Sequence, residues 1–164
     1  MSYDLAVWEG PRPATAADAA AEYEERMDAM EQELDGPGDP PPPTPGIRGF
    51  VEDALAQYPE LTENSGPECP WASAPLIGEA TGDLIYFPMT FSGAEYARDV
   101  IAEIAHAHGL VCYDPQVERL LPDQRAPSAS SIAEAADQAM DDQVEAQGAP
   151  GQRRGWLARL LGRD

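Results

Sequence analysis

Lysine is absent from this chain, and its ten basic residues, all arginines, face 30 acidic residues in 164 for a net charge of −20. Binding to a nucleic-acid duplex requires cations that displace the phosphate counterions. The composition therefore argues against nucleic acid and favours a basic protein as partner, because opposite charge accelerates the encounter of two proteins. The alternative is an acidic surface that only keeps the chain in solution.

Cysteine and long apolar runs are also scarce. Only Cys69 and Cys112 are present, too few for a disulfide framework. No stretch approaches the roughly 18 consecutive apolar residues of a membrane-spanning helix. Asp4 and Glu9 interrupt the N-terminal region where an export signal would be apolar. These absences predict a soluble, cytoplasmic protein whose two thiols stay free and fill ordinary packing positions.

Motifs of catalysis and cofactor binding are missing: there is no P-loop, no glycine-rich dinucleotide turn and no nucleophile elbow. His106, His108, Cys112 and Asp114 are the densest group of ligand-like side chains. Two histidines at i and i+2 point away from each other on a helix, however, which disfavours a shared metal. Cys112, in the middle of a predicted strand of an acidic protein, lacks the electropositive setting that a thiolate needs. We expect no metal, no cofactor and no catalytic residue.

An enzyme remains the alternative interpretation of the same histidines. His106 or His108 would then act as a base near Asp114 in a small hydrolase-like enzyme of unknown substrate.

Hydrophobic periodicity predicts an α+β domain over residues 1–121. The predicted strands lie at 3–8, at 76–80 and 83–91, which form a hairpin, and at 110–113. One predicted helix is capped by Thr44 and ended by Pro59. A second predicted helix runs from a capping box at Ser92 and Glu95 to Gly109, with Tyr96 and Val100 on its inner face. Pro88, which lacks an amide hydrogen, predicts a sheet edge or bulge. The order β-α-β-β-α-β is typical of a ferredoxin-like sandwich.

An acidic helix and a proline-rich linker at 15–45 are predicted as an insertion in this order. Thr15 provides a cap, and a thin apolar stripe that includes Met27 and Met30 follows at helical spacing. Because the stripe is thin, we expect weak packing on the core or an exposed helix that contacts a partner.

Two further segments follow the predicted domain. Residues 122–151 are acidic and rich in alanine and serine, with one marginal surface helix, and they form a flexible arm with the segment that follows. Residues 152–164 form a basic amphipathic tail. Its predicted docking residues are Trp156, Leu157, Arg159 and Leu160. The tail is expected to dock on the acidic body or on a partner, and weak contact with an anionic membrane surface is the alternative.

Three sequence segments carry a resemblance to known proteins. They are Met-Ser-Tyr-Asp-Leu-Ala-Val-Trp at 1–8, Pro70-Trp71, and His-Ala-His-Gly-Leu-Val-Cys-Tyr-Asp-Pro-Gln at 106–116. The chain resembles, from about Tyr3 to Val117, a group of small and mostly uncharacterised bacterial proteins, some of which are similar to immunity proteins of polymorphic toxin systems. The resemblance implies a fold but no catalytic residue.

Charge and the absence of catalytic motifs together predict a non-enzymatic protein-binding module, such as an immunity-type inhibitor of a basic toxin. Acidic side chains of the first helix and of the loop at 60–68 would supply the complementary charge, and aromatic residues would anchor the partner. The predicted partner-binding residues are Glu22, Glu25, Asp28, Tyr58 and Trp71.

Overall fold

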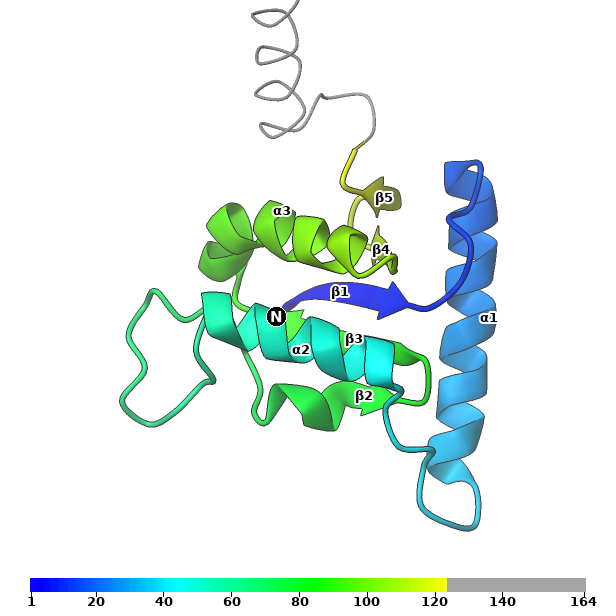
Figure 1. The fold of residues 1–164 in the computed structure, drawn as a ribbon, viewed down its shortest axis with the longest axis horizontal. Coiled ribbons are helices and arrows are strands. Elements are labelled where there is room, and N and C mark those ends of the chain that lie inside the picture. The colour runs from blue at the N-terminus through cyan, green and yellow to red at the C-terminus, as the bar shows by residue number, and fades with distance from the viewer. Residues whose placement is uncertain (124–164) are drawn as a thin grey trace, which may run out of the picture. The chain divides into compact units, whose positions relative to one another are not determined.

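In the computed structural model, which describes residues 1–123, strand β1 (Tyr3–Trp8) is the centre of a five-stranded antiparallel sheet (Figure 1). The other strands are β2 (Ala80–Thr81), β3 (Leu84–Met89), β4 (Val111–Asp114) and β5 (Arg119–Leu121), in the order β2-β3-β1-β4-β5. Strand β1 pairs with β3 along its whole length and with β4 through Ala6, Val7 and Trp8. With three α-helices, the described part of the chain is an α+β unit, as predicted.

Helices α2 (Pro45–Gln57) and α3 (Phe91–Ala107) cover one face of this sheet (Figure 1). Side chains of β1 alternate between the two faces, and Leu5 and Val7 point into the core beneath these helices. The helices contribute the buried Phe50 and Ile101 to the same core. Thr44 accepts a hydrogen bond from the amide of Ile47, which confirms the predicted cap of α2.

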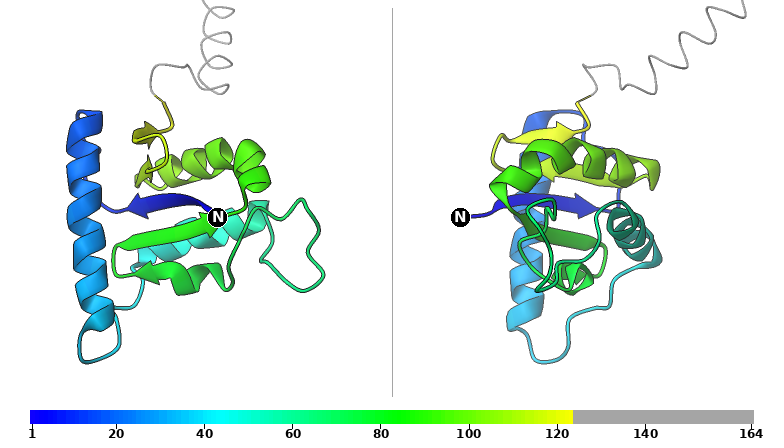
Figure 2. Two further views of the ribbon diagram at one scale, coloured as in Figure 1. Left: turned by 180° about the vertical axis from the view of Figure 1, so that it is seen from behind. Right: turned by 90° about the vertical axis from the view of Figure 1, so that its left-hand side faces the viewer.

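Helix α1 (Ala16–Asp35) packs on the opposite face of the sheet, with Thr15 as its cap (Figure 2). Ala6, Trp8, Leu84, Val111 and Tyr113 form the buried sheet side of this second core, and Ala19, Ala20, Tyr23, Met27 and Met30 form its helix side. The rings of Tyr23 and Tyr113 lie 5.1 Å apart between their centroids. The acidic helix is therefore docked by its predicted stripe, and the outermost stripe residue, Leu34, is exposed.

The first predicted hairpin strand is wrong for most of its length. Residues Leu76–Glu79 form a 3₁₀ helix, η1, and only Ala80 and Thr81 pair with β3. The amide of Leu76 donates to the carboxylate of Glu60 at 2.9 Å, so a loop side chain satisfies it in place of a neighbouring strand.

Helix α3 begins at Phe91, earlier than the predicted capping box. Thr90 is the cap, and its hydroxyl oxygen accepts from the amide of Gly93 at 2.9 Å. A Cβ at Gly93 would lie 2.5 Å from Cα of Pro70, so only glycine permits this close approach. Tyr96 and Val100, predicted on the inner face, are exposed, because the buried face runs instead through small residues such as Ala97.

Pro88 lies in β3, between β2 and β1, and not in an edge strand or at a bulge as predicted. Its carbonyl oxygen accepts from the amide of Ala72 at 3.1 Å, beside an isolated bridge between Trp71 and Met89. The nitrogen and carbonyl of one strand residue point to the same side, so the missing donor faces this isolated bridge and not the paired strand β1. None of the helices within residues 1–123 is long and apolar enough to cross a membrane.

Candidate functional site

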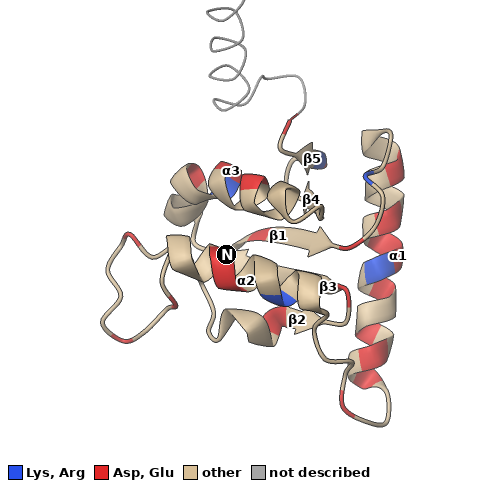
Figure 3. Cartoon of the chain, viewed as in Figure 1, with Lys and Arg blue, Asp and Glu red and all other residues tan. Residues whose placement is uncertain are grey.

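Helix α1 carries more exposed acidic residues than any other element of the described chain, and its acidic residues are red in Figure 3. Glu25 and Asp28, both predicted to contact a partner, are exposed on it. The other exposed acidic residues of this helix are Asp18, Glu24, Glu31, Glu33 and Asp35. We call the exposed carboxylates of α1, including Glu25 and Asp28, the acidic face.

Arg26, the one basic residue of α1, is bound within the fold. Its guanidinium group lies 3.0 Å from Glu22 and 3.0 Å from Asp83, and it donates to the carbonyl of Glu9 at 2.9 Å. It also lies over the indole ring of Trp8, 5.5 Å from the ring centroid. Arg26 thus fastens α1 to the sheet, and the half-buried Glu22 orients Arg26.

Three further arginines of the described chain are engaged in internal bonds, whereas Arg119 of β5 is exposed. Arg12 donates to the carbonyls of Leu121 and Pro122, both at 2.8 Å, and Arg48 donates to the carbonyl of Pro43 at 2.9 Å. Arg98 binds Tyr3, Asp99 and Asp114. These bonds hold the guanidinium groups of Arg12, Arg48 and Arg98 at fixed places within the fold.

Trp71 is a core residue, which corrects its assignment as a partner anchor. Only 1% of it is exposed, its indole N–H donates to the carbonyl of Tyr58 at 2.9 Å, and its ring lies 5.9 Å from that of Phe87. The sequence places Trp71 in a loop, but the bridge to Met89 sets its backbone against the edge of β3 and turns the ring inward. Sequence periodicity could not show that bridge.

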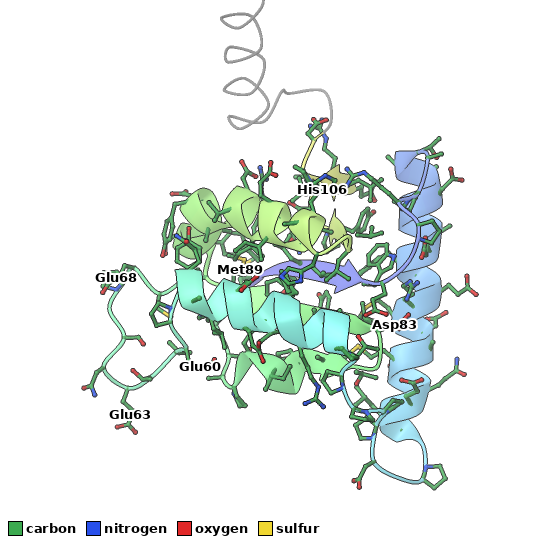
Figure 4. All side chains as sticks on the ribbon, in the orientation of Figure 1. Glu60, Glu63, Glu68, Asp83, Met89 and His106 are labelled. Atoms are coloured by element: carbon green, nitrogen blue, oxygen red, sulfur yellow. The ribbon has the colours of Figure 1, made fainter. Side chains whose placement is uncertain are left out.

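Tyr58, the C-cap residue of α2, is half-buried and stays partly accessible. Its ring lies 6.0 Å from the ring of Tyr96, which is 43% exposed on α3. Tyr58 and the loop that follows it lie at the opposite end of the unit from α1 (Figures 1 and 4). The structure therefore separates the predicted partner-binding residues into two surfaces.

A pocket of about 130 Å³ opens in the loop that follows α2. Its lining residues are Tyr58, Pro59, Ser65, Gly66, Glu68, Cys69 and Pro70. Glu63 and Glu68 of this loop are exposed, whereas Glu60 is half-buried and caps the amide of Leu76. The sequence hypothesis used the charge of this loop but missed the pocket, because its walls come together only after the chain turns back toward β3.

The histidines and Asp114 do not form the pair that the enzyme interpretation requires. His108 lies 2.7 Å from the carboxylate of Asp53 on α2, and His106 is exposed. Asp114 is fully buried and binds Tyr3, the amide of Gln116 and, at 3.5 Å, Arg98. Within residues 1–123 there is no group of three or more His, Cys, Asp or Glu side chains arranged to hold a metal ion.

Cys112 is fully buried in β4. Burial, and next the nearby charge of Asp114, raises the pKa of its thiol to about 12. The thiol therefore stays protonated at neutral pH, whereas a nucleophilic cysteine reacts as the thiolate.

No protein-family model, no curated protein and no solved structure matches this chain. The segment predicted at 122–151 lies outside the described residues from 124 onward, and the tail predicted at 152–164, with the docking residues Trp156, Leu157, Arg159 and Leu160, lies wholly outside them.

Proposed function

We propose that this chain is a non-enzymatic protein-binding module that binds a basic protein through the acidic face of α1. The observation that carries the proposal is the docked state of that helix. Its apolar stripe is buried on the sheet and its arginine is engaged by Glu22, Asp83 and Glu9, while its exposed carboxylates face outward. A rigid surface of one charge binds a complementary partner without the cost of ordering a flexible segment.

The partner class follows from the charge. A toxin that acts on nucleic acid needs a basic groove, and an acidic helix is complementary to such a groove. We therefore propose an immunity-type inhibitor of a basic toxin as the particular role.

We also propose that the unit is a ferredoxin-like sandwich with two additions. The order β2-β3-β1-β4, with α2 and α3 on one face, supports the β-α-β-β-α-β pattern. Helix α1 would then be an insertion that covers the second face, and β5 an addition next to β4.

Affinity capture from native cells tests the proposed function. The full chain is immobilised and the retained proteins are eluted with a salt gradient, alongside a variant that carries Glu24→Gln, Glu25→Gln, Asp28→Asn and Glu31→Gln. A matched control neutralises four exposed acids elsewhere: Glu52, Glu63, Glu95 and Glu103. The proposal expects a basic protein retained by the parent and the control, released by salt, and lost from the α1 variant. Equal loss from both variants would mean that net charge alone, and not the acidic face, retains the protein.

A further inference from the structure

The pocket in the loop after α2 combines an aromatic wall with a carboxylate. Tyr58 lines it, and the exposed Tyr96 lies against Tyr58 and donates to the carbonyl of Pro67 at 3.5 Å. Tyrosine ring faces are electronegative and attract cations, with a gain that grows as the cation loses water. The two rings therefore give the pocket and its rim a surface that suits a cationic side chain.

Glu68 supplies the negative charge of the pocket, and Gly66, which has no side chain, leaves space for the carboxylate of Glu68. A Cβ built on Gly66 would lie 2.4 Å from Oε2 of Glu68 and 2.7 Å from Oε1, so the carboxylate folds back over the glycine backbone. Both residues line the pocket. Burial raises the pKa of Tyr96, and the nearby Cys69, Tyr58 and Glu68 raise it further.

Four arginines of the described chain, Arg12, Arg26, Arg48 and Arg98, do not bond to this pocket. The internal partners of Arg12, Arg26, Arg48 and Arg98 all lie outside the loop at 59–70. Glu63 adds a second exposed negative charge to the same loop (Figure 4). The volume of about 130 Å³ suits one extended side chain and is small for a drug-sized ligand.

We propose that this pocket binds an arginine or lysine side chain presented by a protein partner. The aliphatic stem would lie against Pro59 and Pro70, the charged group would meet the carboxylate of Glu68, and the tyrosine rings would flank it. The source of the side chain rests on the proposed function, which supplies a basic partner. The loop that forms the pocket lies at the opposite end of the unit from α1 (Figure 1), so the pocket would be a second contact point.

A titration followed by NMR tests the pocket without the partner. Acetyl-arginine amide and acetyl-lysine amide are added to the ¹⁵N-labelled full chain at constant ionic strength, and uncharged acetyl-norleucine amide serves as the control. The proposal expects saturable shifts of the amides in residues 58–70 with a cationic probe and none with norleucine. Shifts confined to α1, or equal shifts with all three probes, would overturn it.

Two loop variants separate the carboxylate of the pocket from general charge. Glu68→Gln removes the proposed partner of the cation, and Glu63→Gln removes one charge from the same loop outside the pocket lining. We expect Glu68→Gln to weaken probe binding about fivefold or more, as for the loss of one charged hydrogen bond, and Glu63→Gln to change it less than twofold. Equal effects of the two variants would contradict the assignment of Glu68.

Failure of this inference is distinguishable from failure of the proposed function. If the captured partner is lost from the α1 variant but binds Glu68→Gln like the parent, the pocket is not a contact point and the function stands. If neither cationic probe binds the pocket, the inference fails whatever the capture experiment shows.

Discussion

The hydroxyl group of Tyr3, in the first residue of β1, donates a hydrogen bond to the carboxylate of Asp114, the last residue of β4. Asp114 is fully buried, and Arg98 of α3 approaches both its carboxylate, at 3.5 Å, and the hydroxyl of Tyr3, at 3.3 Å. Burial and this hydrogen bond raise the pKa of Tyr3, and the bond to Tyr3 raises the pKa of Arg98. The side chains of Tyr3, Asp114 and Arg98 thus connect the central strand β1, its neighbour β4 and helix α3.

Replacing Asp114 should therefore destabilise the fold more than replacing Tyr3. Asp114→Ala leaves the hydroxyl of Tyr3 and the amide of Gln116 without their acceptor and removes one of the partners of Arg98, and we expect a loss of about 3 kcal/mol. Tyr3→Phe keeps the ring that packs edge-on against Phe91 and should cost about 1 kcal/mol. Urea unfolding followed by tryptophan fluorescence measures both values, and the reverse order would contradict the assigned roles.

Trp71 should affect stability and not partner binding directly. Trp71→Ala removes a buried indole and should cost about 3–5 kcal/mol, whereas Trp71→Phe keeps most of the volume and loses the hydrogen bond to Tyr58 at about 1–2 kcal/mol. The measurement is the free energy of unfolding, with partner affinity of the folded Phe variant beside it. A Phe variant of parental stability that no longer binds the partner would restore Trp71 as an anchor.

The two cysteines should differ sharply in reactivity. Cys69 is partly exposed at the pocket, whereas Cys112 is fully buried, with the pKa of its thiol raised to about 12. We expect a disulfide reagent to modify one thiol rapidly in the native chain and both thiols in urea. Cys69→Ser should abolish the rapid phase, and a rapid phase that survives this change would place Cys112 within reach of solvent.

Alkaline pH should lower stability, and the sign follows from the raised pKa values. The Cys112 thiol has an ordinary pKa of 9.0 and a folded value of about 12. The unfolded chain therefore loses this proton first as pH rises, so the stabilisation is complete below pH 9 and declines from there toward pH 12. Burial also raises the pKa values of Tyr23, Tyr86 and Tyr113, which act in the same direction above pH 10.

The thiol contribution can be isolated by substitution. Between about pH 8 and pH 10, Cys112→Ala should lose about 1 kcal/mol less stability than the parent, since one pH unit above the ordinary pKa corresponds to roughly 1.4 kcal/mol. Urea unfolding of both proteins at the two pH values provides the measurement. An identical decline in both would show that Cys112 is not a source of the pH dependence.

The sequence could predict those elements whose signals are local. The alternation of β1 and the caps Thr15 and Thr44 need only neighbouring residues, and all three are present. The errors at 76–80 and at Trp71 have a different cause, because a contact distant in sequence decides the conformation: Glu60 with Leu76, and Met89 with Trp71. The start of α3 is set by the local cap of Thr90 on the amide of Gly93, a signal that the sequence contains and that the prediction missed.

In the candidate site, too, the features with local signals could be predicted from the sequence, and those set by distant contacts could not. The acidic residues of α1 could be predicted from composition and helical spacing, and so could the stripe that docks the helix. Its position on the second face of the sheet could not, because Trp8 and Tyr113, which receive it, come from strands that pair only in the folded chain. Strand β5 also escaped prediction, because its three residues follow a turn in which Glu118 adopts a φ of 51°.

Carboxylate footprinting of the complex with the captured partner tests the central claim most directly. Exposed acids are labelled with a carbodiimide and an amine in the free and the bound chain, and the labelled positions are quantified by mass spectrometry. The account predicts protection of Glu24, Glu25, Asp28 and Glu31 on α1, with Glu95 and Glu103 of α3 labelled equally in both states. Full labelling of the α1 acids in the bound chain would contradict the claim that the acidic face binds the partner.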